Sequence, residues 1–91
     1  MQKVRLYTAS WCPFCANLKE LLDGKNIPYL EINVDSEAGG LEFTNIQKVT
    51  KSDMLPTVIV GNKALVPEKT FITIDQCFGI VQTLLKELVK I

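Results

Sequence analysis

The sequence predicts an α/β protein with a four-stranded mixed sheet packed by helices, in the order βαβαββα. Two strand-like runs flank a helical pattern in residues 3–34, which indicates a βαβ unit with parallel strands and a right-handed crossover. A continuously apolar run at residues 57–60 leads through a two-residue turn signal, Gly61-Asn62, into residues 63–66, which predicts an antiparallel hairpin. An unbroken apolar stripe at helical spacing then predicts a last helix.

The first strand is expected at residues 3–7, where Val4 and Leu6 share one face. The helix after it is expected to begin at Pro13, because the first helical position does not need an N–H. Gly24 is expected to end that helix in a left-handed conformation. The apolar side of the helix consists of Phe14, Cys15, Leu18, Leu21 and Leu22.

An alternation of apolar and polar residues predicts the second strand at residues 29–34. Its apolar positions are Leu30, Ile32 and Val34. A second helix is expected from residue 36 or 37 to residue 48, although the pair Gly39-Gly40 weakens its first turn. Its candidate core residues are Leu41, Phe43 and Ile46.

The last helix is expected after a loop at residues 67–71. Thr73 and Gln76 have the spacing of a capping box, which marks the start of a helix. The apolar stripe consists of Ile74, Cys77, Phe78, Val81, Leu84, Leu85 and Leu88. The polar residues opposite are Asp75, Gln82, Lys86, Glu87 and Lys90.

Composition favours one folded domain spanning residues 1–91. Hydrophobic residues make up 47% of the chain and charged residues 22%, which argues against disorder. The net charge is zero, so nothing suggests nucleic acid or an anionic membrane as a partner. Strand-like sequence begins at once, no apolar run is long enough to span a bilayer, and we expect a cytoplasmic monomer.

Two cysteines three positions apart, Cys12 and Cys15, precede the first helical pattern. Backbone N–H groups at a helix start and the positive end of the helix dipole favour a thiolate, which is the form that attacks disulfides. Cys12 is expected at the N-cap, open to solvent, with a pKa below the free value of about 8.5. Cys15 is expected to turn toward the core and to resolve the reaction. This pattern indicates thiol–disulfide redox chemistry.

A metal site is the first alternative for the cysteine pair. A structural zinc site needs four Cys or His ligands, whereas this chain has no histidine and only one cysteine beyond the pair. A zinc ribbon within one chain is therefore excluded, and no bound metal or other cofactor is expected. A metal or iron–sulfur cluster shared between two chains stays open as an alternative.

Pro56 precedes the most apolar strand and allows two interpretations. It could be a strand-edge proline that merely lacks a donor, or it could form a cis peptide bond with Leu55. A cis bond would turn the backbone of Leu55 toward the sulfur of Cys12 and offer an extended partner a docking site.

Other candidate residues also have an ordinary structural interpretation. Cys77 lies on the apolar stripe and is expected to be a buried core residue, with a regulatory or dimer-forming thiol as the alternative. Thr73 and Asp75 would cap the last helix, and the same helix start could hold a ligand's carboxylate. Trp11 and Phe14 are expected to line a docking surface beside the thiolate.

The stretch Tyr7-Thr8 leading into Cys12-Pro13-Phe14-Cys15, together with Pro56 and the element order, resembles the glutaredoxins of the thioredoxin superfamily. The resemblance covers nearly the whole chain and implies a thioredoxin-like (glutaredoxin) fold. It implies that Cys12 is the nucleophile, Cys15 the resolving thiol and Pro56 a cis-proline. It further implies dithiol oxidoreductase activity on disulfide-containing proteins or small disulfides, with glutathione as the co-substrate that recharges the pair.

The glutathione-binding region departs from the glutaredoxin pattern. Ser52 and Asp53 stand where a Gln-Arg pair is usual, and Met54-Leu55-Pro56 replaces Thr-Val-Pro. The usual Gly-Gly-x-Asp segment is replaced by a longer run, residues 66–73, with Thr73 and Asp75 as the nearest substitutes. The expected substrate or glutathione contacts are Trp11, Pro13, Phe14, Leu55, Pro56, Thr73 and Asp75.

Trp11 favours an alternative partner, because a tryptophan before the motif is more typical of thioredoxins and of redoxins that reduce ribonucleotide reductase. Such proteins are recharged by a thioredoxin reductase. Pro13 within the motif goes against cluster binding in this family.

Overall fold

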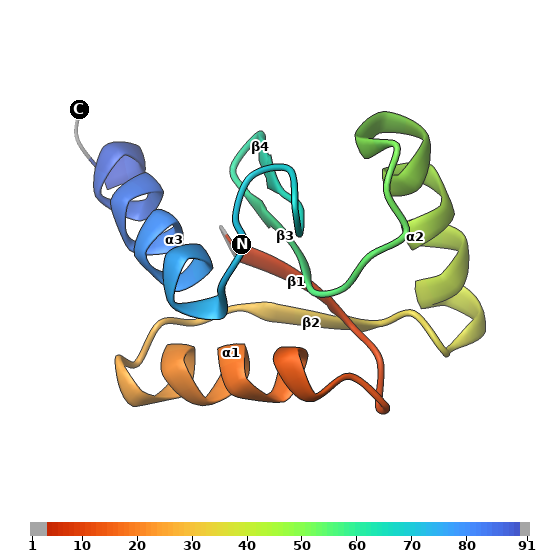
Figure 1. Ribbon diagram of the computed structural model, residues 1–91, viewed down its shortest axis with the longest axis horizontal. Coiled ribbons are helices and arrows are strands. Elements are labelled where there is room, and N and C mark those ends of the chain that lie inside the picture. Colours follow the sequence, from red (N-terminus) through yellow and green to blue (C-terminus); the bar gives the residue numbers. More distant parts are fainter. Residues whose placement is uncertain (1–3, 90–91) are drawn as a thin grey trace.

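The computed structural model describes residues 4–89, so the expected positions of Lys3 and Lys90 lie outside the described residues. The elements follow the predicted order (Figure 1). They are β1 (Val4–Thr8), α1 (Pro13–Gly24), β2 (Leu30–Asn33), α2 (Glu37–Thr50), β3 (Thr57–Val60), β4 (Lys63–Leu65) and α3 (Ile74–Val89).

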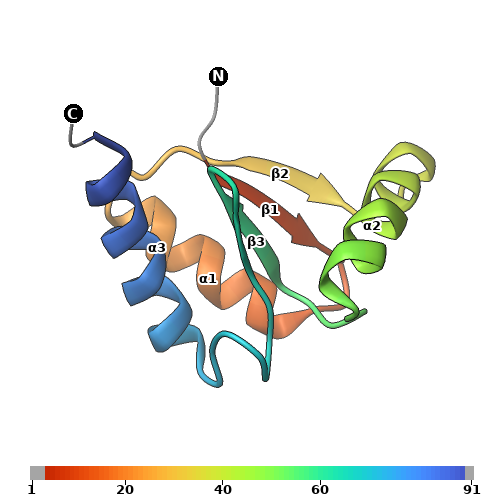
Figure 2. The same cartoon turned by 90° about the horizontal axis from the view of Figure 1, so that it is seen from above.

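The four strands form one mixed sheet in the order β2-β1-β3-β4. β1 and β2 run parallel, as the βαβ unit predicts, whereas β1–β3 and β3–β4 are antiparallel. Helices α1 and α3 pack together on one face of the sheet, and α2 lies on the other side (Figure 2). The C-terminal end of β1 therefore leads directly into the loop before α1.

The main core lies between the sheet and the pair α1 and α3. Its buried residues are Val4, Leu6, Leu18, Leu22, Val58, Val60, Leu65, Phe71, Cys77 and Val81. Cys77 is fully buried, and burial raises the pKa of its thiol to about 12. The prediction of a core role for Cys77 is therefore confirmed.

The other face of the sheet carries α2. The Tyr7 ring lies 5.7 Å from the Phe43 ring, and the Tyr7 hydroxyl donates a hydrogen bond to Glu42 at 3.1 Å. Arg5 also forms an ion pair with Glu42. Gly39 is required at the start of α2, because any Cβ there would overlap the carbonyl oxygen of Asn33.

Three predicted core positions are exposed instead. Leu41 is separated from buried Phe43 by two residues, or about 200° of helix, so it faces away from the sheet. Leu30 lies on β2, which is an edge strand. Leu88 lies in the last turn of α3 beside the exposed turn at Gly61.

The predicted left-handed stop at Gly24 is also wrong. Gly24 remains within α1, and the left-handed residue is Asn26, with a φ of 56°. The chain turns there because the N–H groups of Lys25 and Asn26 donate to the last carbonyls of the helix. Among the helices described in residues 4–89, none is long and apolar enough to cross a membrane.

Candidate active site

The cysteine pair lies at the start of α1. Cys12 is the N-cap residue with an extended backbone, and Pro13 is the first residue of the helix, as predicted. A disulfide joins Cys12 to Cys15. The backbone N–H of Cys15 donates to the sulfur of Cys12 at 3.1 Å. When the disulfide is reduced, the same donor would stabilise a thiolate on Cys12.

The expectation that Cys12 is open to solvent is wrong for this disulfide-bonded state. Cys12 is 7% exposed and Cys15 is 1% exposed. The two cysteines form a small cluster with Ala9, against which Val34 and Leu55 pack. That packing covers most of Cys12, although Cys12 remains the more accessible of the two.

A cis peptide bond joins Leu55 to Pro56. Of the two interpretations of Pro56, the cis-proline is therefore confirmed. Pro56 is buried, and Leu55 packs against the cysteine cluster. The Thr57 hydroxyl donates to the Met54 carbonyl at 2.8 Å and so ties the segment before β3 to the strand itself. The late proline is therefore held beside the cysteine pair.

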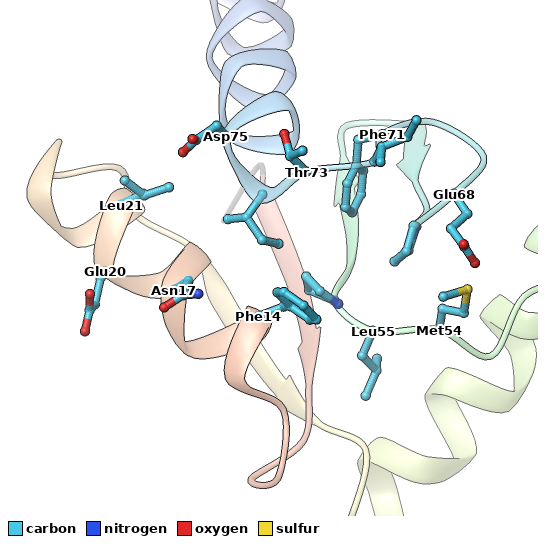
Figure 3. Close-up of a pocket in the computed structure, with 14 residues that line it drawn as sticks. Phe14, Asn17, Glu20, Leu21, Met54, Leu55, Glu68, Phe71, Thr73 and Asp75 are labelled. Atoms are coloured by element: carbon cyan, nitrogen blue, oxygen red, sulfur yellow. The ribbon is translucent and has the colours of Figure 1, made fainter.

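A cavity of about 630 Å³ adjoins this site (Figure 3). Five of the predicted contact residues line it. They are Phe14, Leu55, Pro56, Thr73 and Asp75. The loop between β4 and α3 supplies the far wall, with Pro67, Glu68, Phe71 and Ile72. Trp11 and Pro13 are exposed but do not line this cavity, so the structure does not bring them together with the other five.

Trp11 is anchored on the opposite side of the loop by Asp35, a residue that the sequence analysis missed. The indole N–H of Trp11 donates to one Asp35 oxygen at 3.4 Å. The backbone N–H and the hydroxyl of Ser10 donate to the other oxygen at 3.4 and 3.2 Å. Asp35 follows β2, which is parallel to β1, so both strands end at the same sheet edge. The predicted parallel pairing of these strands was the signal that could have identified Asp35.

Glu31 links β1, α1 and β2 near the loop that joins β1 to α1. Its carboxylate accepts from the Thr8 hydroxyl at 2.7 Å and from the Lys19 ammonium at 2.9 Å. Partial burial alone would raise the pKa of Glu31, but the hydrogen bonds from Lys19 and Thr8 and the charge of Lys19 outweigh it and lower that pKa. The end of β1, the middle of α1 and β2 are thereby held together.

The start of α3 has the predicted capping box. The Gln76 side-chain oxygen accepts from the N–H groups of Ile72 and Thr73 at 2.8 and 3.2 Å, and the Gln76 N–H donates to the Thr73 hydroxyl at 3.1 Å. Thr73 thus has a structural role as well as a place in the cavity wall.

The negative charge of the cavity comes from Asp75, which was predicted, and from Glu20 and Glu68, which were not. Asp53, which with Ser52 stands where a Gln-Arg pair is usual in the family, is exposed and does not line the cavity. Glu20 and Glu68 line it together with Asp75, whereas no lysine or arginine among the described residues belongs to its lining. Within residues 4–89, no group of three or more His, Cys, Asp or Glu side chains is placed to hold a metal ion.

Comparison with known proteins agrees with this geometry. A family model described as Glutaredoxin matches residues 4–65. A glutaredoxin of Neisseria meningitidis serogroup B is 32% identical over 62 residues, which cover 67% of this chain and 71% of that protein. A glutaredoxin of Ricinus communis is 31% identical over 61 residues, covering 66% of this chain and only 60% of that protein.

Solved structures show the same fold. The crystal structure of a buckwheat glutaredoxin–glutathione complex superposes with a TM-score of 0.71 at 20% identity, covering 93% of this chain and 77% of that one. The mixed sheet with its three helices is thus thioredoxin-like, as the resemblance implied. With its cysteine pair at the start of α1, the chain is a redox protein that belongs to the glutaredoxin family.

Proposed function

We propose that the protein is a dithiol oxidoreductase that reduces disulfides in other molecules. The Cys12 thiolate attacks one sulfur of the substrate disulfide, forms a mixed disulfide and expels the other substrate sulfur as a thiolate. Cys15 then loses its proton and attacks the sulfur of Cys12. The second substrate thiolate leaves, the Cys12–Cys15 disulfide forms, and two electrons have passed from the protein to the substrate.

One observation carries this proposal. The Cys15 N–H donates to the Cys12 sulfur within a disulfide at a helix start, next to the Leu55–Pro56 segment. The donor stabilises negative charge on Cys12, and Cys12 is the more accessible sulfur-bearing residue of the pair. The more buried Cys15 is placed to complete the reaction. These features support Cys12 as the attacking thiol and Cys15 as the resolving thiol.

Two substitutions test the proposal. Cys12→Ser is expected to abolish reduction of a small disulfide, because it removes the attacking sulfur. Cys15→Ser is expected to accumulate a mixed disulfide between Cys12 and the substrate, detected as an added mass. The expected control is Cys77→Ser, which removes a thiol outside the site. Full activity of Cys12→Ser would contradict the assignment.

The reductant that recharges the pair has two candidates. Family membership supports glutathione, and the buckwheat relative was solved in complex with it. The lining of the cavity favours the second candidate, a thioredoxin reductase, because no side chain of residues 4–89 in that lining offers a cation to the carboxylates of glutathione. With that donor, ribonucleotide reductase is one candidate substrate.

A coupled assay separates the two reductants. Reduction of one disulfide substrate is followed with glutathione and its reductase in one arm and with thioredoxin reductase in the other. Turnover only in the first arm would support glutathione, and turnover only in the second would support the reductase. Iron and zinc measured in the purified protein test the alternative of a metal or iron–sulfur carrier shared between two chains. A cytoplasmic, monomeric state stays a prediction from the sequence.

A further inference from the structure

The cavity beside the cysteine pair has a negatively charged rim. Glu20 comes from α1, Glu68 from the loop between β4 and α3, and Asp75 from the first turn of α3. Figure 3 shows Glu20 and Asp75 toward one end of the cavity and Glu68 toward the other, beside Met54. Carboxylates are ionised at neutral pH, so an occupant of the cavity would meet negative charge at both ends.

No cation in the described part of the chain, residues 4–89, forms an ion pair with a carboxylate of this rim. The ion pairs found among residues 4–89 join Arg5 to Glu42 and Lys19 to Glu31, so they involve none of the three rim carboxylates. Lys69 follows Glu68 in the chain, but its ammonium donates to the carbonyl oxygens of Thr50 and Lys51 at 2.7 and 3.1 Å. That lysine is therefore held at the end of α2. A concave site lined by one sign of charge attracts the opposite sign.

The floor and walls of the cavity are largely apolar and adjoin the disulfide. Phe14 is 59% exposed and Ile72 is 81% exposed, although both line the cavity. Leu55 contacts the cysteine cluster from one side and lines the cavity as well. A chain segment bound to the sulfur of Cys12 would therefore lie with its neighbouring side chains against these residues.

We propose that this cavity selects protein substrates in which lysine or arginine, together with an apolar residue, flanks the disulfide cysteine. The proposal rests on the function proposed above and names its substrate class. The apolar walls take the apolar side chain and the stems of the basic residues, while Glu20, Glu68 and Asp75 pair with the basic groups. Glutathione carries more carboxylates than ammonium groups, so the same rim disfavours it.

Matched peptides test this preference. Three short peptides carry one cysteine linked by a disulfide to the same reporter thiol, and they differ only in whether lysine, glutamine or glutamate flanks the cysteine. The kcat/KM for each is measured with the unchanged protein and with the triple variant Glu20→Gln, Glu68→Gln, Asp75→Asn. Glu87→Gln removes one carboxylate near the end of α3, outside this cavity, and serves as the control for the loss of a single charge. Circular dichroism verifies that each variant is folded.

The test compares one ratio between the unchanged protein and its variants. That ratio is kcat/KM for the lysine peptide divided by kcat/KM for the glutamate peptide. The ratio for the unchanged protein alone does not test the cavity, because a lysine beside the disulfide speeds the attack of any thiolate. An exposed charge pair contributes roughly 0.2–1 kcal/mol, so the loss of one rim carboxylate should lower the ratio about twofold. The triple variant, which loses all three, should lower it about five- to tenfold. Glu87→Gln should leave it unchanged. Salt should compress the ratio of the unchanged protein, because the Debye length falls to about 3 Å at 1 M.

Two results would overturn the proposal. One is an unaltered ratio in the triple variant while all three peptides are still reduced, which would reject the charged rim and leave the dithiol chemistry intact. The other is a small cationic disulfide, cystamine, reduced with as large a dependence on the three carboxylates as the lysine peptide, which would assign the site to a free amine rather than a protein segment. Failure of the proposed function itself would be seen separately, as peptide reduction by Cys12→Ser.

Discussion

Two regions of the molecule meet at the cavity, and they differ in how far they match the family. Residues 4–65 match the glutaredoxin family model and contain the disulfide, the cis-proline and the whole sheet. The segment from residue 66 to the first turn of α3 lies beyond that match, yet it supplies Glu68, Phe71, Ile72 and Asp75 to the cavity wall.

The two regions have different tasks. The first carries the disulfide chemistry, and the second selects the substrate. The reacting sulfurs need a fixed helix start, and the sheet and α1 hold that start through buried side chains and the Glu31 hydrogen bonds. In the far wall, Phe71 belongs to the main core, whereas Glu68 and Ile72 are exposed. These exposed side chains only have to present a shape and a charge to the substrate, so they can differ without disturbing the fold. The predictions below test whether the two regions behave so differently.

The largest expected effect is on stability. Leu18→Ala empties a fully buried position on α1 and should lower the free energy of unfolding by about 3 kcal/mol. Ile72→Ala, on the exposed far wall, should change it by less than about 0.5 kcal/mol. Urea denaturation followed by circular dichroism measures both. Equal losses would show that Ile72 packs into the core, as its neighbour Phe71 does.

Two glycines make the same comparison for the helices. Gly39→Ala should destabilise the protein by about 2 kcal/mol, because the new Cβ would collide with the backbone of Asn33. Gly79→Ala, in α3, meets no atom and should raise stability by about 0.5–1 kcal/mol, since alanine favours a helix over glycine. Thermal unfolding compares the two variants. A stable Gly39→Ala protein would refute the close approach of α2 to the end of β2.

The Glu31 carboxyl should make stability depend on pH. Its pKa is lowered in the folded protein, so the folded state binds fewer protons than the unfolded state near that pKa. The stabilisation is therefore present above the unfolded value of 4.5 and is lost as pH falls through the folded value. Glu31→Gln should cost under about 1 kcal/mol at neutral pH, because the pair with Lys19 is partly exposed.

The control for that series is Glu87→Gln, which removes a carboxylate with no hydrogen-bond or ion-pair partner found among residues 4–89. Denaturation of each variant between neutral pH and pH 3 gives the comparison. A Glu31→Gln deficit that stayed constant over that range would contradict the lowered pKa.

Asp35→Asn should have the smallest effect on stability and a visible effect on the loop. The amide keeps the size of the side chain but loses the charge that accepts from Ser10 and Trp11. Trp11 is the only tryptophan, so quenching of its fluorescence by acrylamide reports on this loop alone. We expect stronger quenching and about a twofold loss of kcat/KM, whereas Asp53→Asn should change neither.

The sequence predicted the shared region well, because local patterns determine it. The cysteine spacing, Pro13 and the alternation along the strands each act over a few residues, and the cis bond at Pro56 followed from the family resemblance. The role of Asp35 depends on two strands ending at one edge, which no local pattern reveals. The burial of Cys12 depends on Leu55, far along the chain, packing against it.

The far wall was less predictable for the same reason. Thr73 and Asp75 were identified at the start of α3, but Glu20 and Glu68 line one cavity only because α1 and the β4–α3 loop both border it in the folded chain. Tertiary packing determines the side chains that border a cavity. The start of a helix, in contrast, is determined by the local sequence.

The central claim is that Cys12 attacks and Cys15 resolves, and limiting alkylation of the reduced protein tests it most directly. The protein is treated at neutral pH with less than one equivalent of iodoacetamide, and peptide mass spectrometry locates the label. We expect label on Cys12 first, little on Cys15, and none on buried Cys77 until the protein is unfolded. Label on Cys15 at a rate equal to or above that of Cys12 would contradict it.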